Sequence, residues 1–110
     1  MQKIYICSPL RDNVEHNIMR AREYCFEETV QGNLPIAPHI YFTQFMDDTN
    51  ATQRNQAFEF NKELIKFCDK LHVYGEYISS GMQFEIEYAK SIGKEIIYKR
   101  RKKCQEENQT

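Results

Sequence analysis

Short segments rich in β-branched and aromatic residues alternate along this chain with longer segments of helical periodicity. The strand-like segments are "KIYIC" (3–7), "KLHVYG" (70–75) and "KEIIYK" (94–99). Apolar residues recur at helical spacing over 12–31, 57–69 and 82–92. This alternation predicts an α/β fold, a three-layer Rossmann-like (flavodoxin-like) parallel sheet of about four to five strands flanked by helices.

The first two helices have a predicted buried face. In the first, the apolar positions are Val14, Ile18, Ala21, Cys25 and Phe26, and Asp12 or Asn13 is a candidate N-cap. In the second, they are Phe60, Leu64 and Phe67. We expect these side chains to pack against the sheet.

Prolines and turn formers dominate the segment between these helices. "LPIAPHIYF" (34–42) contains two prolines, so we expect only an interrupted or edge strand at 34–37. The polar stretch 43–56 predicts a loop before the second helix. With a length of 110 residues, the pattern predicts a single domain at 1–98, followed by a basic, then polar, solvated tail at 99–110.

Charge and cysteine content narrow the partners and the compartment. A formal net charge of −1 provides no field to attract nucleic acid or a membrane, so we expect neither as a partner. The four cysteines contain no CxxC pair, which favours reduced thiols over a zinc or redox motif. The N-terminus lacks the apolar region of a signal peptide, and no apolar run has the length of a membrane span. We therefore expect a soluble, cytoplasmic protein.

Two glutamates lie close together in "MQFEIEYAK" (82–90), the helix before the last strand. Glu87 falls on the polar face, with Lys90 as a partner, and is expected at the surface. Glu85 falls within the apolar stripe, where a carboxylate is costly unless that part of the helix borders a cavity. Periodicity alone fits two roles for Glu85 about equally, a carboxylate that neutralises the helix N-terminus or a nucleophile or general base in a cleft.

Several short motifs along residues 3–98 resemble the nucleoside 2-deoxyribosyltransferase superfamily and its relatives, the 2′-deoxynucleoside 5′-phosphate N-hydrolases. They are "IYICSPLR", "APHIYFTQFMDD", "CDKLHVYG" and "SSGMQFEIEYAKSIGK". The second also resembles a small uncharacterised branch found in phage and bacterial genomes. The resemblance implies that Glu85 attacks C1′ of the deoxyribose and forms a glycosyl-enzyme ester. It also implies that Tyr5 points at this nucleophile and that Ser8 and Arg11 hold a 5′-phosphate.

Two positions depart from the pattern of the transferases. Where catalytic members carry an aspartate that engages the sugar or the base, this chain has Asn61. An amide can hydrogen-bond a hydroxyl but cannot supply a proton at neutral pH, unless Glu63, Asp47 or Asp48 substitutes. Ser79, six residues before Glu85, matches the phosphate-using hydrolases and favours a nucleotide ligand.

The loops after the strands provide further candidates for substrate binding, because ligands of parallel sheets collect at the carboxyl ends of strands. These residues are Pro9, Leu10, His39, Gln44, Phe45, Asp48, Gly75, Ser80, Gly81 and Met82. The loop at 44–48 suits stacking and hydrogen bonding of a base, although a plain solvated loop fits almost as well. His39 could contact a base, whereas His16 and His72 are expected to be structural or exposed.

Some candidates also have simpler interpretations. Tyr5 could be a packing residue, and Arg11 could be a surface residue. Cys7 has no histidine at a recognisable spacing, so we expect a small buried group rather than a nucleophile. No metal-ligand spacing, GxGxxG or Walker motif is present, so no metal or cofactor is expected.

The resemblance predicts an N-glycosidase or deoxyribosyltransferase-like enzyme that cleaves the N-glycosidic bond of a 2′-deoxynucleoside 5′-monophosphate. Its catalytic residues would be Glu85, Tyr5 and Asn61. The alternatives are a non-catalytic module that binds a nucleotide or an ADP-ribose-like molecule, or an interaction protein with a vestigial site. Members of the superfamily complete their pockets with residues of a neighbouring subunit, so we expect a homodimer or higher homo-oligomer.

Overall fold

The computed structural model describes residues 1–99. In chain order the elements are β1 (Lys3–Cys7), α1 (Val14–Val30), β2 (Leu34–Ile36), α2 (Pro38–Phe42), α3 (Ala51–Phe67), β3 (Lys70–Val73), α4 (Ser80–Ser91) and β4 (Glu95–Tyr98). Apart from Lys99, the tail expected at 99–110 lies outside the described residues. No helix within residues 1–99 is both long and apolar enough to cross a lipid bilayer.

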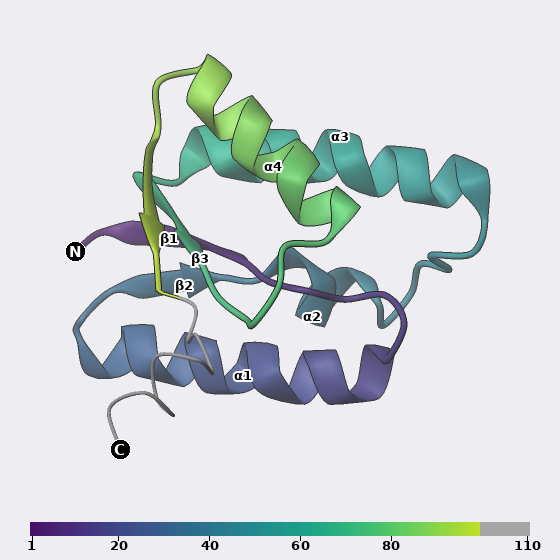
Figure 1. Cartoon of the computed structure of the whole chain (residues 1–110), viewed down its shortest axis with the longest axis horizontal. Helices are drawn as coiled ribbons and strands as arrows, with labels where there is room; N and C mark the ends of the chain where they lie inside the picture. The colour runs from purple at the N-terminus through teal and green to yellow at the C-terminus, as the bar shows by residue number, and fades with distance from the viewer. Residues whose placement is uncertain (100–110) are drawn as a thin grey trace.

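The four strands form one parallel sheet in the order β2-β1-β3-β4 (Figure 1). This order is flavodoxin-like and confirms the predicted fold class. β2 is an edge strand, as its proline requires. After β2 the chain crosses to the other side of β1, so the carboxyl ends of β1 and β3 lie at the point where the strand order reverses. That point is where open α/β sheets bind their ligands.

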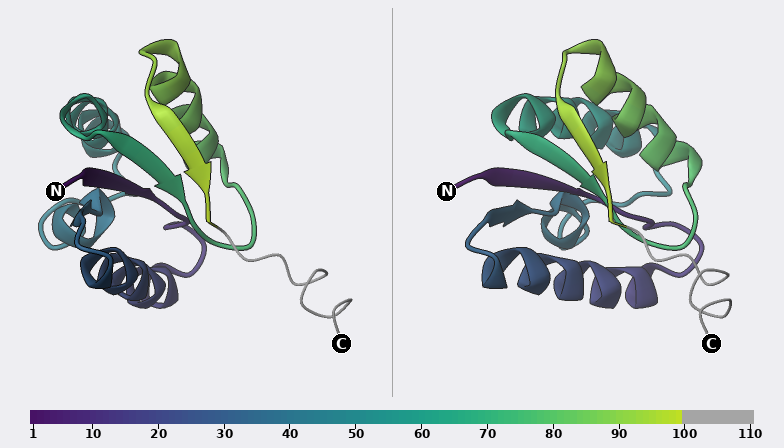
Figure 2. Two further views of the ribbon diagram at one scale, coloured as in Figure 1. Left: turned by 90° about the vertical axis from the view of Figure 1, so that its left-hand side faces the viewer. Right: turned by 60° about the vertical axis from the view of Figure 1, so that its left-hand side comes forward.

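Helices cover both faces of the sheet, giving three layers (Figure 2). Tyr5 and Cys7 of β1 pack with α3 and α4 on one face, whereas Ile4 and Ile6 pack with α1 on the other. This alternation is the ordinary consequence of strand geometry. All four side chains are at most 1% exposed, so β1 is the centre of the core. The same alternation places Tyr5 and Cys7 on the side of the sheet that carries Glu85.

The segment between β2 and β3 contains more helix than the sequence predicts. Residues 38–42 form α2, whose only signal is a proline in its first turn. α3 begins at Ala51 rather than at 57, and Asn50 caps it by accepting a hydrogen bond from the backbone N–H of Gln53 at 3.0 Å. The first turns of α3 extend beyond the carboxyl edge of the sheet (Figure 1). They cover no strand there, so they carry no apolar stripe for periodicity to detect.

The predicted buried faces of α1 and α3 are partly wrong. In α1, Val14 and Phe26 are exposed, and the buried residues are Asn17, Ala21, Tyr24 and Glu28. Polar side chains can be buried here because they have hydrogen-bond partners, such as His72 and Tyr74 for Glu28. In α3, Phe60 and Phe67 are exposed, while Ile65 reaches the core, as does Cys68 directly after the helix. A periodicity that counts only apolar residues detects neither the buried polar side chains of α1 nor the exposed phenylalanines of α3.

Candidate active site

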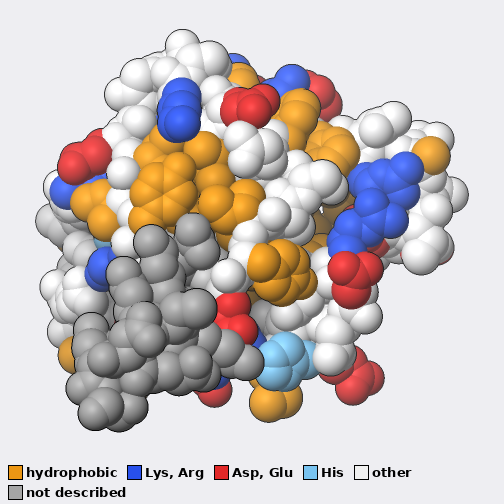
Figure 3. Space-filling view, in the orientation of Figure 1, with side chains coloured by type: hydrophobic (Ala, Val, Ile, Leu, Met, Phe, Trp, Pro, Cys, Tyr) orange, Lys and Arg blue, Asp and Glu red, His pale blue; other side chains and the backbone are white. Residues whose placement is uncertain are grey.

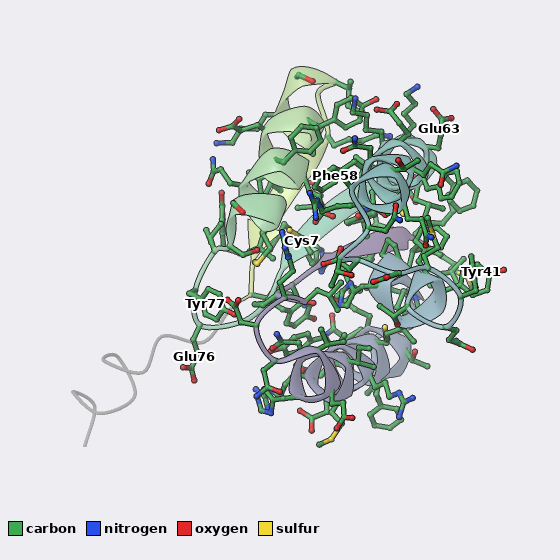
Figure 4. All side chains as sticks on the ribbon, turned by 90° about the vertical axis from the view of Figure 1, so that its right-hand side faces the viewer. Cys7, Tyr41, Phe58, Glu63, Glu76 and Tyr77 are labelled. Atoms are coloured by element: carbon green, nitrogen blue, oxygen red, sulfur yellow. The ribbon has the colours of Figure 1, made fainter. Side chains whose placement is uncertain are left out.

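A cavity of about 390 Å³ opens at the carboxyl edge of the sheet, a volume that suits a small-molecule ligand. Most of the predicted site residues line it, and these are Ser8, Leu10, Arg11, His39, Asp48, Asn61, Ser79, Ser80, Gly81, Met82 and Glu85. Figure 4 looks onto this edge, with Cys7 near the middle of the view and Phe58 and Tyr77 around it. Residues far apart in the sequence therefore meet in one hollow.

Glu85 lies on the side of α4 that faces the sheet, one turn from the helix start. Its neighbours on that side, Met82, Ile86 and Ala89, are buried in the core, whereas Glu85 is half-buried and borders the cavity. This is how a carboxylate occupies an apolar stripe. Glu87, in contrast, is exposed and accepts a hydrogen bond from Gln83 at 2.9 Å instead of pairing with Lys90.

Two side chains hold the Glu85 carboxylate by the same oxygen. The Tyr5 hydroxyl donates to Oε2 at 2.9 Å, and the Asn61 Nδ2 donates to Oε2 at 3.2 Å. Tyr5 comes from β1 and Asn61 from α3, so the three contacting residues belong to three elements. Both of these bonds go to Oε2, and neither uses Oε1.

Burial raises the pKa of Glu85 to about 7, although hydrogen bonds from Tyr5, Cys7 and Asn61 act in the opposite direction. The carboxyl group therefore changes its charge near neutral pH. Burial, and then the charge of Glu85, raise the pKa of Tyr5 well above its ordinary value. Tyr5 thus remains a hydrogen-bond donor to the carboxylate. A carboxyl group with a strongly raised pKa in a cavity is typical of catalytic sites.

The Asn61 amide donates from Nδ2 to Glu85, and its oxygen, Oδ1, is a hydrogen-bond acceptor. Among residues 1–99, no group hydrogen-bonds to its buried Oδ1. Of the acids that could replace the superfamily's aspartate, Glu63 is exposed and pairs with Lys66 at 3.1 Å, and Figure 4 shows it pointing outward. Asp47 is exposed and accepts a hydrogen bond from Thr49. Of the three, Asp48 alone lines the cavity.

Hydroxyl groups and cations surround the rest of the cavity. Ser8 Oγ lies 3.2 Å from His39 Nε2, and burial lowers the pKa of His39 to about 4, so the imidazole is neutral at pH 7. Ser79 caps α4 by accepting a hydrogen bond from the Met82 N–H at 3.2 Å. The Arg11 guanidinium forms an ion pair with Asp48, with 3.2 Å between Nε and Oδ2.

Five of the predicted site residues do not line this cavity. One of them, Tyr5, is buried and contacts Glu85. Pro9 and Gly75 line a neighbouring cavity of about 490 Å³ beside α1. Gly75 has a φ of 103°, and a Cβ atom there would approach Pro9 Cδ to 2.8 Å, so this glycine permits a close contact between two loops. Gln44 and Phe45 are exposed and do not line the cavity. Phe42 lines it in their place.

Several residues of the cavity have no counterpart among the sequence candidates. They are Asp12, Phe42, Arg54, Ala57, Phe58 and Tyr77. Arg54, Ala57, Phe58 and Asn61 follow one another at helical spacing on the early turns of α3. Because the sequence analysis started this helix at 57 rather than at 51, it did not predict that this face lines the cavity.

Cys7 is fully buried, and its thiol lies 3.8 Å from the backbone oxygen of Met82. Burial raises the pKa of Cys7 well above its ordinary value, which opposes a role as nucleophile. His72 is buried on the other face of the sheet, in agreement with a structural role. Within residues 1–99, no three His, Cys, Asp or Glu side chains form a group that could hold a metal ion.

Comparisons with known proteins relate the chain to a sequence family and to solved structures. A family described as "Domain of unknown function (DUF7768)" matches residues 2–99. A search of curated proteins gives no match. The 2-deoxyribosyltransferase of the psychrotolerant bacterium Bacillus psychrosaccharolyticus has a TM-score of 0.74 and 17% identity, over 92% of this chain and 74% of that one.

A 2-deoxyribosyltransferase from Leishmania mexicana has a TM-score of 0.64 and 19% identity, over 91% of this chain and 65% of that one. This chain therefore spans less than two thirds of the Leishmania protein. At such identities the likeness shows a shared fold.

Proposed function

Because the chain belongs to the DUF7768 family and shares its fold with 2-deoxyribosyltransferases, we propose that it is an N-glycosidase or deoxyribosyltransferase-like enzyme. Its substrate is a 2′-deoxynucleoside 5′-monophosphate, and Glu85 is the nucleophile. The observation that carries this proposal is the position of Glu85, half-buried in the cavity and held through one oxygen by Tyr5 and Asn61. A carboxylate fixed in this way is the minimum required to stabilise an oxocarbenium-like transition state and then bond to it.

The reaction has two steps. In the first, Oε1 of Glu85 bonds to C1′ while the C1′–N bond breaks. The electron pair of the C1′–N bond leaves with the base, and the base takes a proton from solvent. In the second, water or another base bonds to C1′ and the ester bond breaks, which restores the Glu85 carboxylate. The proton of the attacking water or base goes to solvent. Tyr5 orients the carboxylate throughout.

The polar groups around the cavity support a phosphorylated substrate. Ser8, Arg11 and Ser79 offer hydroxyl and guanidinium donors from the β1–α1 loop and the start of α4. The N-terminal end of α4 adds backbone N–H groups and the positive end of a helix dipole. A 5′-phosphate at this end of the cavity would hold the sugar with C1′ toward Glu85.

Asn61 favours a second candidate function, a module that binds a nucleotide or an ADP-ribose-like ligand without turning it over. An amide beside Glu85 can accept a hydrogen bond from a ligand but cannot donate a proton to a leaving base. The binding module uses the same cavity, so the two functions differ only in turnover.

The test is incubation of the purified protein with a panel of 2′-deoxynucleosides and their 5′-monophosphates, with chromatography for released base. Glu85→Ala is the test variant, and Glu87→Ala is a matched control on the exposed face of the same helix. We expect base release from a monophosphate by wild type and Glu87→Ala and none by Glu85→Ala. No release across the panel, with a saturable thermal shift by a nucleotide, would favour the binding module instead.

A further inference from the structure

Two arginines from different elements meet at Asp48. Arg11, in the β1–α1 loop, lies with its Nε 3.2 Å from the Asp48 carboxylate. Arg54, in the first turn of α3, donates from Nη1 to the Asp48 backbone oxygen at 3.2 Å. Figure 3 shows basic and acidic side chains meeting on the right of the molecule, where α3 extends beyond the sheet. All three residues line the cavity of Glu85.

Arg54 is on the face of α3 that also carries Asn61. Seven residues separate them, which is two helical turns and about 10 Å along the axis. Asn61 contacts Glu85, so the arginine pair and the nucleophile lie at different depths along one wall of the cavity. A ligand that extends away from Glu85 along this wall would reach Arg54.

One cation of the cavity, Arg54, has no carboxylate partner among residues 1–99. The described lining contains two cations, Arg11 and Arg54, against the carboxylates of Asp12, Asp48 and Glu85, so the local position of Arg54, and not the net charge of the cavity, favours an anion. Asp48 gives Arg11 its carboxylate but gives Arg54 only a backbone oxygen. A guanidinium has five N–H donors, and this hydrogen bond uses one of those of Arg54. The remaining donors suit a doubly charged group with several oxygens, such as phosphate.

We propose that Arg54 is a second phosphate-binding arginine, and that Asp48 holds Arg11 and Arg54 together and competes with the ligand phosphate for Arg11. This inference rests on the proposed function for the identity of the ligand, a nucleoside 5′-monophosphate. It gives Asp48 a different role from base recognition. Asp48 orders the two arginines before binding, and the phosphate then displaces its carboxylate from Arg11.

Binding measured by calorimetry tests this without requiring turnover. The probes are the four common 2′-deoxynucleoside 5′-monophosphates and the corresponding nucleosides. Loss of a charge-assisted hydrogen bond predicts that Arg54→Gln weakens nucleotide binding by about 10- to 100-fold and leaves nucleoside binding unchanged. Asp48→Asn should tighten nucleotide binding several-fold, because it removes the competing charge. Arg22→Gln, at an exposed arginine of α1 outside the cavity, is the control and should change neither.

The outcomes separate this inference from the proposed enzyme. Nucleotide affinity unchanged in Arg54→Gln, equal losses for nucleotide and nucleoside, or no nucleotide binding by wild type would each overturn it. If Arg54→Gln fails to fold, tighter binding in Asp48→Asn supports the inference, and unchanged or weaker binding there overturns it. The predicted affinity pattern without base release would retain the arginine site while refuting catalysis.

Discussion

At the scale of single residues, the central feature is the Glu85 carboxyl group, whose surroundings have opposite effects on its pKa. Burial favours the neutral form of Glu85, whereas donors from Tyr5, Cys7 and Asn61 favour the charged form. Burial is the larger effect, so the pKa is about 7. A nucleophile must be ionised, but a less solvated carboxylate is also more reactive toward a developing positive charge.

The first prediction concerns pH. The carboxylate is the active form of Glu85, and its pKa is raised, so activity is low at acidic pH and rises as the group loses its proton. We expect kcat/KM to rise about tenfold per pH unit below pH 7 and to level off above it. Initial rates between pH 5 and 9 measure this profile. A profile flat from pH 5 upward would show that a carboxyl group of ordinary pKa, or none, limits the reaction.

The second prediction concerns Asn61. Asn61→Asp restores the aspartate of the resembled enzymes, but it replaces a donor by a carboxylate in contact with Glu85 Oε2. A like charge at this distance raises the pKa of Glu85 further. We therefore expect the pH profile of the variant to shift to higher pH. At pH 7, activity should fall relative to wild type by about fivefold for the first unit of the shift, because the wild-type group is only half ionised there, and by about tenfold for each further unit.

Rate measurements on Asn61→Asp and on Asn61→Ala separate the loss of the amide donor from the gain of a negative charge. The alanine variant loses the donor without gaining a charge, so its profile should shift less than that of the aspartate. Activity that appears in Asn61→Asp and is absent from wild type would identify the natural protein as a binding module.

The sequence could identify Tyr5 and Asn61, which hydrogen-bond to Glu85, but only part of the rest of the cavity. Tyr5 and Glu85 lie in motifs that resemble the transferases, and Asn61 occupies the position at which those enzymes carry an aspartate. Periodicity by itself placed only Glu85, on the apolar face of its helix. Arg54 and Phe58 depend on a helix start that carries no apolar pattern, and Tyr77 lies in a loop. Phe42 rather than Phe45 lines the cavity, and it belongs to the short helix at 38–42, whose only sequence signal is a proline in its first turn.

At the scale of elements, α1 is joined to the sheet by a buried polar cluster. The Glu28 carboxylate is fully buried and accepts hydrogen bonds from Tyr74 at 2.6 Å and from Asn33 at 2.9 Å, and it lies 2.6 Å from His72 Nδ1. Burial raises the pKa of Glu28, but the hydrogen bonds from Tyr74, Asn33 and His72 outweigh it, so the pKa is lowered. The cluster explains why a helix with a polar buried face stays on the sheet.

The third prediction is that Glu28→Ala destabilises the protein strongly. Removing the carboxylate leaves the buried Tyr74 and His72 groups without a partner, which costs about 2–4 kcal/mol. For a domain of this size the melting temperature should fall by roughly 10–20 °C. Thermal melts at pH 7 measure the melting temperature. Glu27→Ala, at the exposed position next to Glu28, is the control. Equal melting temperatures for the two variants would refute the role of the cluster.

The same cluster has a pH dependence of defined sign. Because the folded-state pKa of Glu28 is lowered, its contribution is complete above the ordinary glutamate pKa and is lost as the pH falls through the folded value. The difference between wild type and Glu28→Ala should therefore narrow on acidification.

The elements themselves were largely predictable, since strands buried on both faces and helices bounded by glycine leave clear patterns. The strands at 3–7, 70–73 and 95–98 and the helices α1 and α4 lie close to the predicted bounds. What the pattern could not supply is which face of α1 is buried. Hydrogen bonding between distant residues decides that, since Glu28 and His72 are 44 positions apart.

At the scale of the whole molecule, the cavity is open and an aromatic cluster lies beside it. Tyr41, Phe42, Phe45 and Phe60 form this cluster, with ring centroids 5.1–6.0 Å apart in each contact. Three of the four rings are at least 42% exposed, and the fourth, Phe42, lines the cavity. Exposed apolar surface of this kind is typical of interaction sites.

The fourth prediction is that the protein forms a homodimer or higher homo-oligomer. We expect light scattering at micromolar concentration to give a mass of at least twice 13.2 kDa. If the aromatic cluster is the contact, Tyr41→Ser together with Phe45→Ser should lower this mass toward that of one chain. Phe26→Ser, at an exposed phenylalanine of α1, is the matched control. A strictly monomeric wild type would refute the prediction.

The most direct test of the central claim is mass analysis of peptides from protein quenched in acid during incubation with a 2′-deoxynucleoside 5′-monophosphate that it cleaves. We expect a deoxyribose 5-phosphate adduct on the peptide that contains Glu85. Glu85→Gln, whose amide oxygen can still accept the hydrogen bonds from Tyr5 and Asn61, should give neither adduct nor base release. An adduct on another side chain, or undiminished base release by Glu85→Gln, would contradict the assignment of Glu85 as the nucleophile.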